Sequence, residues 1–342
     1  MNILELKGET GKSKILFGES INNVLNYTEN KKLFIITDTN VNRIYKEDFP
    51  DGLVFVIRTG ESIKTYETIN LIYTELIKKG YDRTSFILGI GGGVVCDIAG
   101  FVASTYMRGV NFGFVPTTLL AQVDASIGGK NGINFGEYKN MIGTFNQPDF
   151  ILMDFSLLKT LTFDEFKNGI AESIKHALIN DLELVKILIQ NNKKICNYDL
   201  VAIEEIIIRS VKVKLNIVKK DETEKNERKK LNFGHTLGHG VELLNDISHG
   251  KAVSIGIAFA SAISLKYGYI TKGVYVKILN LLKLYELPVK TKLPAGQLIE
   301  KISKDKKKQG NLVNFILLRG MGDVFIKKID LEELQELLND LC

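Results

Sequence analysis

The chain has 342 residues, of which 45% are hydrophobic and 25% are charged, as is usual for a folded globular protein. This length is enough for two domains, each with its own core. The net charge of +5 is small for the length, so it gives no reason to expect a nucleic-acid partner, although it suits a small anionic substrate.

The first half of the chain alternates predicted strands and helices. Short segments rich in β-branched residues and bounded by turn residues predict buried strands over residues 32–38, 53–58, 85–90 and 110–116. Residues 62–80 carry apolar residues at helical spacing and end at Gly80, a typical helix C-cap. This alternation predicts an α/β domain with a parallel sheet.

From about residue 162 the pattern becomes helical. Apolar residues recur with a period of 3.6 over residues 163–181, 181–195, 201–220, 233–244, 250–268 and 273–287. Residues 314–318 and 324–329 predict a small hairpin. We therefore expect an α/β domain over residues 1–160, followed by a mostly helical domain over residues 161–342.

The cysteines and the apolar segments indicate in which cellular compartment the protein is expected. Cys96, Cys196 and Cys342 are too few and too scattered for a disulfide framework, which indicates a reducing, cytoplasmic setting. The first ten residues lack a basic region followed by an apolar one, so we expect no signal peptide. The longest nearly apolar run, 252–264, is shorter than the roughly 20 residues of a membrane span and predicts a buried helix.

Glycines follow the predicted strand 85–90. Gly91, Gly92 and Gly93 allow close backbone approach to a ligand, and the helix after them offers free N–H groups to a phosphate. Val94 breaks the G-x-G-x-x-G pattern, and a plain tight turn is the alternative. Residues 59–62, "TGES", are a second, weaker candidate for a nucleotide contact.

Residues 114–134 combine many polar side chains with glycines, a mixture that a structural loop rarely needs. These polar residues are Thr117, Thr118, Gln122, Asp124, Ser126 and Lys130. Lys139 and Asn140 follow shortly afterwards. We expect irregular, glycine-rich backbone around Lys130 and Lys139, where a lysine can serve as a point charge for an anion.

Three of the four histidines fall within residues 235–249. His235 and His239 are four residues apart, so they share a helix face and could reach one metal ion. His249 and Glu172 are candidates for the third ligand of a catalytic zinc site. The alternative is a set of capping or core histidines. Glu172 and Lys175 lie three apart, which usually marks a surface ion pair, but their apolar neighbours favour a buried site.

Six motifs together resemble the 3-dehydroquinate synthase family, in order and over nearly the whole chain. They span residues 91–109, 116–134, 138–148, 169–179, 231–242 and 248–253. The resemblance implies the sugar-phosphate cyclase fold, with an N-terminal Rossmann-like NAD domain and a C-terminal helical metal-binding domain. It also implies Zn²⁺ (or Co²⁺) held by Glu172, His235 and His249. His239 then contacts the substrate instead of the metal.

The resemblance carries the remaining site residues over position by position. For NAD they are Asp38, Glu61, Lys64, Gly93, Val94, Val95, Cys96, Asp97, Thr117, Thr118, Lys130, Lys139, Leu157, Leu158, Lys159 and Thr160. For the substrate they are Asp124, Lys130, Asn140, Lys175, Lys214, Arg228, Asn232 and His239. Arg108 would reach the site of the neighbouring subunit, which implies a homodimer, and Lys306 or Lys307 would contact the phosphate.

Two positions depart from the family pattern. Cys96 stands where the family usually has Gly, beneath the expected pyrophosphate. Lys251 stands where the family usually has Glu, two residues from His249, so it bears on the surroundings of the metal.

The implied reaction converts 3-deoxy-D-arabino-heptulosonate 7-phosphate into 3-dehydroquinate and phosphate. It proceeds by NAD-mediated transient oxidation, phosphate elimination, re-reduction and aldol closure. The alternatives are a related cyclase with another sugar phosphate, a metal-dependent polyol dehydrogenase and a non-catalytic nucleotide- or metal-binding protein. Neither a nucleic-acid nor a membrane partner is expected.

Overall fold

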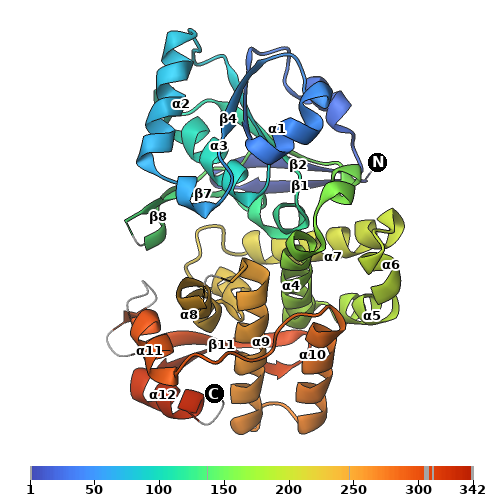
Figure 1. The fold of residues 1–342 in the computed structure, drawn as a ribbon, viewed down its shortest axis with the longest axis vertical. Coiled ribbons are helices and arrows are strands. Elements are labelled where there is room, and N and C mark those ends of the chain that lie inside the picture. The colour runs from blue at the N-terminus through green and yellow to red at the C-terminus, as the bar shows by residue number, and fades with distance from the viewer. Residues whose placement is uncertain (1, 137, 246, 304–307, 310–311, 340–342) are drawn as a thin grey trace. The chain divides into compact units, whose positions relative to one another are not determined.

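The computed structural model describes residues 2–136, 138–245, 247–303, 308–309 and 312–339. Its internal contacts divide the chain into two compact units, Met1–Leu161 and Thr162–Cys342. In Figure 1 the first unit runs from blue to green and the second from green to red. None of the described helices combines the length and the apolar character that a membrane span requires.

The first unit is built on a seven-stranded sheet with the order β1-β2-β9-β6-β5-β3-β4. The strands are β1 (Asn2–Gly8), β2 (Gly11–Phe17), β3 (Leu33–Asp38), β4 (Leu53–Ile57), β5 (Phe86–Gly91), β6 (Asn111–Pro116) and β9 (Phe150–Met153). All neighbouring pairs are parallel except β1 with β2. The central strand β5 is buried along its whole length, because both faces of a parallel sheet are covered.

Helices join these strands. They are α1 (Thr39–Tyr45), α2 (Tyr66–Lys78) and α3 (Gly93–Thr105), with the 3₁₀ segments η1 (Ile21–Tyr27), η2 (Lys46–Asp48), η3 (Glu61–Ile63), η4 (Tyr106–Arg108) and η6 (Phe155–Thr160) and the π-helical η5 (Ala121–Ala125). The predicted helix over 62–80 is divided, because Lys64 leaves the helical conformation and Thr65 then caps α2.

The strand order reverses between β3 and β5. From β3 the chain moves outward to β4, whereas β5 lies on the other side of β3 and leads on to β6. Open parallel sheets bind ligands at the carboxyl ends of the strands that flank such a reversal. Here those ends are Asp38 of β3 and Gly91 of β5. The topology therefore predicts that a nucleotide binds at this edge of the sheet.

A separate two-stranded sheet holds Lys130 and Lys139. It consists of β7 (Lys130–Phe135) and β8 (Tyr138–Phe145), which pair antiparallel. The prediction of irregular backbone was therefore wrong for Lys130, which pairs regularly with Phe145, whereas Lys139 does lie where the register of the two strands shifts. The glycines serve strand pairing instead: a Cβ on Gly143 would lie 2.4 Å from the carbonyl oxygen of Asn131 on the partner strand.

The second unit is mainly helical, as predicted. Its helices are α4 (Phe163–Asn180), α5 (Leu182–Gln190), α6 (Asn192–Cys196), α7 (Leu200–Val218), α8 (His235–Asn245), α9 (His249–Lys266), α10 (Lys272–Leu284), α11 (Ala295–Ser303), α12 (Leu331–Asn339) and the 3₁₀ segment η7 (Glu227–Asn232). The predicted hairpin is confirmed as part of a small sheet of β10 (Lys308–Gln309), β11 (Leu312–Gly320) and β12 (Asp323–Asp330).

Helix α9 is the centre of this unit, and its residues 252–264 are all buried. Glycines bring α8 close against it. A Cβ on Gly256 would lie 1.8 Å from the carbonyl oxygen of Gly234, and a Cβ on Gly238 would lie 3.0 Å from that of Ala252. This close approach brings the first residues of α8 and α9 together.

Candidate active site

Three predicted metal ligands meet in the second unit. Glu172, on α4, is completely buried, and its Oε1 lies 3.4 Å from Nε2 of His235 and 3.3 Å from Nε2 of His249. The donor atoms of these three residues all lie within 4.8 Å of one another. One carboxylate oxygen thus stands between two imidazole nitrogens.

This arrangement fits a divalent metal. Nitrogen and oxygen ligands lie about 2.0–2.2 Å from a tetrahedral zinc, so two such ligands are about 3.3–3.6 Å apart. The distances from the carboxylate to both histidines fall in that range. Two imidazoles and one carboxylate also leave a fourth position for water or substrate, as catalytic zinc sites do.

Local packing places the two histidines. Gly234, with φ of +79°, precedes His235 at the start of α8, and a side chain there would collide with Ile257 of α9. His249 begins α9, and the next residue, Gly250, donates its N–H to Oδ1 of Asn168 over 2.9 Å. Asn168 is on α4, one turn before Glu172, so this bond ties the helices of two ligands together.

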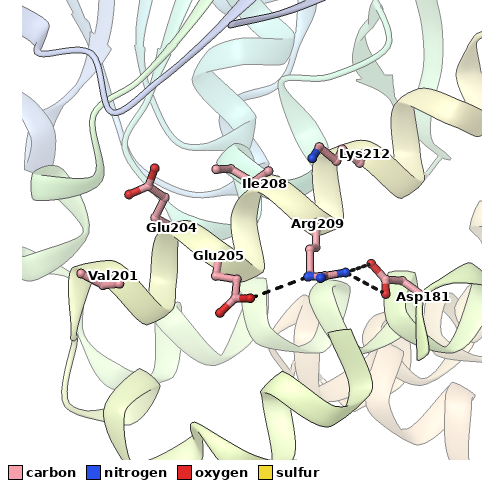
Figure 2. A pocket seen from close by; sticks show the side chains of 7 residues that line it. All are labelled: Asp181, Val201, Glu204, Glu205, Ile208, Arg209 and Lys212. Carbon is pink, nitrogen blue, oxygen red and sulfur yellow. Dashed lines mark hydrogen bonds and ion pairs between the residues drawn. The ribbon is translucent and has the colours of Figure 1, made fainter. Parts of the chain in front are cut away.

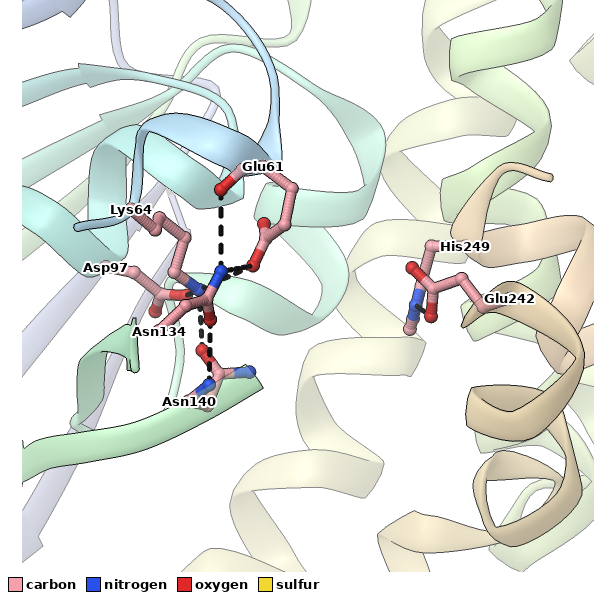
Figure 3. Close-up of polar contacts among 7 residues, drawn as sticks. All are labelled: Glu61, Lys64, Asp97, Asn134, Asn140, Glu242 and His249. Carbon is pink, nitrogen blue, oxygen red and sulfur yellow. Dashed lines mark hydrogen bonds and ion pairs between the residues drawn. The ribbon is translucent and has the colours of Figure 1, made fainter. Parts of the chain in front are cut away.

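A second layer of groups holds the histidine rings. Oε2 of Glu242, on α8, lies 3.5 Å from Nδ1 of His249, and the carbonyl oxygen of Phe233 lies 3.3 Å from Nδ1 of His235. Figure 3 shows Glu242 beside His249. Burial lowers the pKa of His249, but its hydrogen bonds to the carboxylates of Glu172 and Glu242 outweigh this effect and raise the pKa to about 10. Oxygen partners of this kind fix the ring orientation of metal-binding histidines.

His239 stands apart from this cluster. Its ring centroid is 5.2 Å from that of His235, yet among the described residues it is not part of the group of donors around Glu172. Helical spacing therefore paired the wrong histidines for a shared donor cluster. Lys175 does join: its Nζ forms an ion pair with Oε2 of Glu172, and both side chains are buried, which rules out a surface ion pair.

The remaining predicted substrate residues of this unit lie on α7 and η7. Lys214 and Arg228 are both buried despite their charge. The Arg228 guanidinium donates to the carbonyl oxygen of Glu222, and Nδ2 of Asn232 donates to Glu224 over 2.6 Å. Besides their contacts within the protein, these buried cations are candidates for contacts with an anionic ligand.

In the first unit, Lys64 organises a second cluster. Its side chain is 2% exposed, and its Nζ lies 2.6 Å from Oδ2 of Asp97, 2.6 Å from Oδ1 of Asn140 and 3.4 Å from Oε1 of Glu61. Figure 3 shows these groups converging. Burial lowers the pKa of Lys64, but Asp97 and Glu61 outweigh it and hold the pKa above its usual value.

The other predicted NAD residues cluster at the carboxyl ends of the parallel strands. Asp38 ends β3 and caps α1 by accepting from the N–H groups of Asn40 and Val41. Residues Gly93 to Asp97 are the first five residues of α3, which follows β5. Thr117 and Thr118 follow β6, and Leu157 to Thr160 lie in η6 after β9. Leu157 and Leu158 are buried, whereas Lys159 and Thr160 are exposed.

Four further predicted site residues lie outside the two clusters described above. Asp124 is half-buried in η5, and Lys130 is exposed at the start of β7. Arg108 is exposed at the end of η4, with φ of +68°. Lys139 is half-buried on β8. Lys306 and Lys307 lie outside the described residues.

The structure shows the surroundings of Cys96 and Lys251, the two residues that depart from the family pattern. Cys96 is buried on α3, with its Sγ 4.0 Å from the carbonyl oxygen of Gly91, and burial raises the pKa of its thiol. Nζ of Lys251 lies 3.7 Å from Oδ2 of Asp164, a carboxylate that also pairs with Lys167. Lys251 is thus part of a surface ion-pair group.

A separate hollow of about 450 Å³ lies along α7 in the second unit, with Asp181, the N-cap of α5, also lining it. Figure 2 shows Arg209 at its centre, paired with Asp181 at 3.2 Å and with Glu205 at 3.9 Å. None of the predicted site residues lines it. Since its central cation is satisfied by its own neighbours, this hollow is not our candidate site.

Sequence reasoning missed two residues of the site. Glu242 lay within a recognised motif, but its contact with His249 depends on the packing of α8 against α9. Asn134 bridges Glu61 and Asn140, which are far apart in sequence. The one sequence signal for Asn134 was the polar character of segment 114–134, in which it lies.

Comparison with known proteins gives a consistent result. The family models for the N-terminal and C-terminal parts of 3-dehydroquinate synthase match residues 54–168 and 169–308. The 3-dehydroquinate synthase of Pelobacter propionicus is 40% identical over 315 residues, covering 89% of this chain and 88% of the relative. That of Streptococcus suis is 40% identical over 321 residues, 90% of each chain.

Solved structures of related cyclases have the same fold. A 2-epi-5-epi-valiolone synthase from Streptomyces hygroscopicus, with NAD⁺ and Zn²⁺ bound, is 26% identical with a TM-score of 0.88, covering 100% of this chain and 99% of its own. A 2-deoxy-scyllo-inosose synthase with NAD⁺ and Co²⁺ is 23% identical with a TM-score of 0.85, covering 99% and 100%. The predicted fold class, a Rossmann-like parallel-sheet domain with a helical domain, is confirmed. The chain belongs to the 3-dehydroquinate synthase family.

Proposed function

We propose that this chain is a 3-dehydroquinate synthase that converts 3-deoxy-D-arabino-heptulosonate 7-phosphate into 3-dehydroquinate and phosphate. The observation that carries the proposal is the cluster of Glu172, His235 and His249 in a chain of this family. Its distances of 3.3 and 3.4 Å match the spacing of ligands on a divalent metal.

Two cofactors belong to the proposal. Glu172, His235 and His249 would hold Zn²⁺ or Co²⁺, and the residues at the carboxyl ends of β3 and β5 would hold NAD. When bound, NAD supplies transient oxidation and re-reduction of the substrate, and the metal supplies a Lewis acid. The related cyclase structures that contain NAD⁺ with zinc or cobalt support this pairing of cofactors.

Lys175 would orient the metal-binding carboxylate. Its ammonium pairs with Oε2 of Glu172, while Oε1 of the same carboxylate faces both histidines. This division keeps one oxygen directed at the metal position. His239, beside His235 but outside the donor cluster, is available to carry a proton to or from the substrate.

The basic residues would bind the two anionic ends of the substrate. Arg228 is buried and offers a planar fork that matches a carboxylate, and Lys214 adds a second buried charge in the same unit. Lys130 and Asn140, on the β7–β8 sheet, would bind the phosphate together with a lysine of the segment 306–307. Asp124 and Asn232 would accept or donate hydrogen bonds to hydroxyl groups.

The nearest alternative is a cyclase that acts on another sugar phosphate. A substrate without a carboxylate has little use for Arg228 and Lys214, so the presence of both residues supports the heptulosonate. Likewise, we propose a homodimer to which Arg108 contributes across the interface, and a cytoplasmic location in which Cys96 and Cys196 remain reduced. Both described cysteines are free, which is compatible with that location.

The test is a turnover assay. The purified protein is incubated with the heptulosonate phosphate, NAD and zinc, and both free phosphate and NADH absorbance are followed. We expect phosphate release that requires NAD, without accumulation of NADH. Stoichiometric NADH without phosphate would instead indicate a polyol dehydrogenase, and phosphate release from a sugar phosphate lacking the carboxylate would indicate another cyclase.

A further inference from the structure

Asn134 connects the two predicted ligand-binding segments of the first unit. Its Nδ2 donates to Oε1 of Glu61 over 2.9 Å, and its backbone N–H donates to the carbonyl oxygen of Lys64 over 2.8 Å. Its Oδ1 accepts from the backbone N–H of Asn140 over 2.8 Å. Figure 3 shows Asn134 between Glu61 and Asn140.

The backbone at Asn140 needs such support. Ile133 pairs with Ile142 and Phe135 pairs with Tyr138, so residues 139–141 of β8 lie opposite the single residue Asn134 of β7. Asn140 adopts φ of +51° inside this bulge. A non-glycine residue in this region is strained by roughly 1–3 kcal/mol unless its surroundings hold it, and bulges commonly redirect a side chain at a functional site.

The side chain of Asn140 is fixed as well. Nζ of Lys64 donates to Oδ1 of Asn140 over 2.6 Å. An amide whose oxygen accepts from an ammonium has only its N–H groups to offer an anionic oxygen. The hydrogen bond to Lys64 therefore selects the amide orientation that can donate to a phosphate.

We propose that Asn134 is a positioning residue that holds Asn140 in its phosphate-binding conformation and at the same time ties it to the NAD-contacting segment of Glu61 and Lys64. This inference rests on the proposed function, since it takes Asn140 as a phosphate contact. Asn134 acts through Asn140 and touches neither phosphate nor NAD itself.

The experiment measures the Kd of inorganic phosphate by calorimetry, on zinc-loaded protein with saturating NAD. The variants are Asn134→Ala, Asn140→Ala and the double variant. Asn146→Ala is the matched control, because Asn146 also ties the same hairpin to the unit by one side-chain bond, to Ser104, but does not contact Asn140. Urea unfolding of each variant reports stability.

We expect Asn134→Ala to weaken phosphate binding roughly tenfold, the size of one lost hydrogen bond to a charged ligand. The double variant should bind phosphate no more weakly than Asn140→Ala alone, because Asn134 acts only through Asn140. Asn146→Ala should bind phosphate like the unmodified protein.

Four results would overturn the proposal: no loss in Asn134→Ala, losses that add in the double variant, an equal loss in Asn146→Ala, or no loss in Asn140→Ala. The proposed function is judged separately by phosphate release from the heptulosonate phosphate. A chain that fails that assay can still show the predicted pattern of phosphate affinities, so the two failures are distinguishable.

Discussion

The two units hold clusters of opposite design. In the second unit a fully buried carboxylate, Glu172, is surrounded by His235, His249 and Lys175. In the first unit a buried ammonium, Lys64, is surrounded by Glu61, Asp97 and Asn140. In the first of these clusters Lys175 pairs with Oε2 of Glu172, while Oε1 lies between two imidazole nitrogens at the spacing of metal ligands. In the second, the oxygens surround the Lys64 ammonium itself.

The comparison separates two roles. The Glu172 cluster is suited to binding a metal directly, because its donor atoms face one another at ligand spacing. The Lys64 cluster is suited to holding loops and amides in position for larger ligands. A substitution in one cluster should therefore change the binding of its own ligand and leave the binding at the other cluster unchanged.

Apart from the histidine variants, the largest effect should come from Lys64→Met. Removing the ammonium leaves Glu61 and Asp97 close together without their cation, so the Kd of NAD should rise by on the order of 10²-fold while zinc content stays unchanged. Calorimetry with NAD checks this. Lys79→Met, which removes a half-exposed lysine 3.9 Å from Glu75, is the control and should bind NAD normally.

Arg228→Lys tests recognition of the substrate carboxylate in the second unit. A lysine keeps the charge but loses the planar fork, so kcat/KM should fall by roughly 10–10²-fold with NAD affinity unchanged. Arg209→Lys is the control, because Arg209 pairs with Asp181 away from the site. Equal kinetics in the Arg228 and Arg209 variants would remove Arg228 from substrate binding.

Asn168→Ala should have a moderate effect on the metal. It removes the acceptor for the N–H of Gly250 at the start of α9, which costs about 1 kcal/mol, or roughly a fivefold loss of zinc affinity if the cap holds His249 in place. Asn168→Asp retains an acceptor and should keep near-normal affinity. Competition with a chromophoric chelator gives both values, and identical affinities in the two variants would contradict this role.

The smallest effect should come from Lys251→Glu, which restores the usual residue of the family. Lys251 pairs with Asp164 at 3.7 Å, and Lys167 lies closer to the same carboxylate, at 2.9 Å. Surface pairs contribute about 0–1 kcal/mol, so zinc affinity should change less than about twofold. A tenfold change would mean that Lys251 acts on the metal.

Much of the fold follows from the sequence. The strands β3, β5 and β6 were predictable because buried parallel strands are short apolar runs bounded by turn residues. The strand β4 was predicted as well, but its expected burial was wrong: it lies at the edge of the sheet, and its Val54 and Val56 are exposed. The glycines Gly91 to Gly93 then mark the carboxyl end of β5 at the reversal of strand order. The β7–β8 pair escaped prediction because Gly132 and Gly143 interrupt the alternation of side chains that identifies a strand.

The sites were predictable only in part, for a physical reason. Helical spacing shows which residues share a face, so His235 and His239 seemed equivalent. It cannot show that α9 packs against α8 through Gly234 and Gly256 and thereby brings in His249. The ligand set with His249 was predicted from the resemblance to the family and not from residue spacing. The contacts of Glu242 and Asn134 could not be predicted, because they depend on how segments distant in sequence pack together.

The most direct test of the account is the zinc content of single alanine variants at 235, 239 and 249 after gel filtration in metal-free buffer, with turnover measured on the same samples. We predict that His235→Ala and His249→Ala lose their zinc, because two remaining ligands do not form a stable site. His239→Ala should keep its zinc and lose about 10²–10⁴-fold in rate, as expected for a proton carrier. Loss of zinc in His239→Ala with retention in His249→Ala would contradict the ligand set.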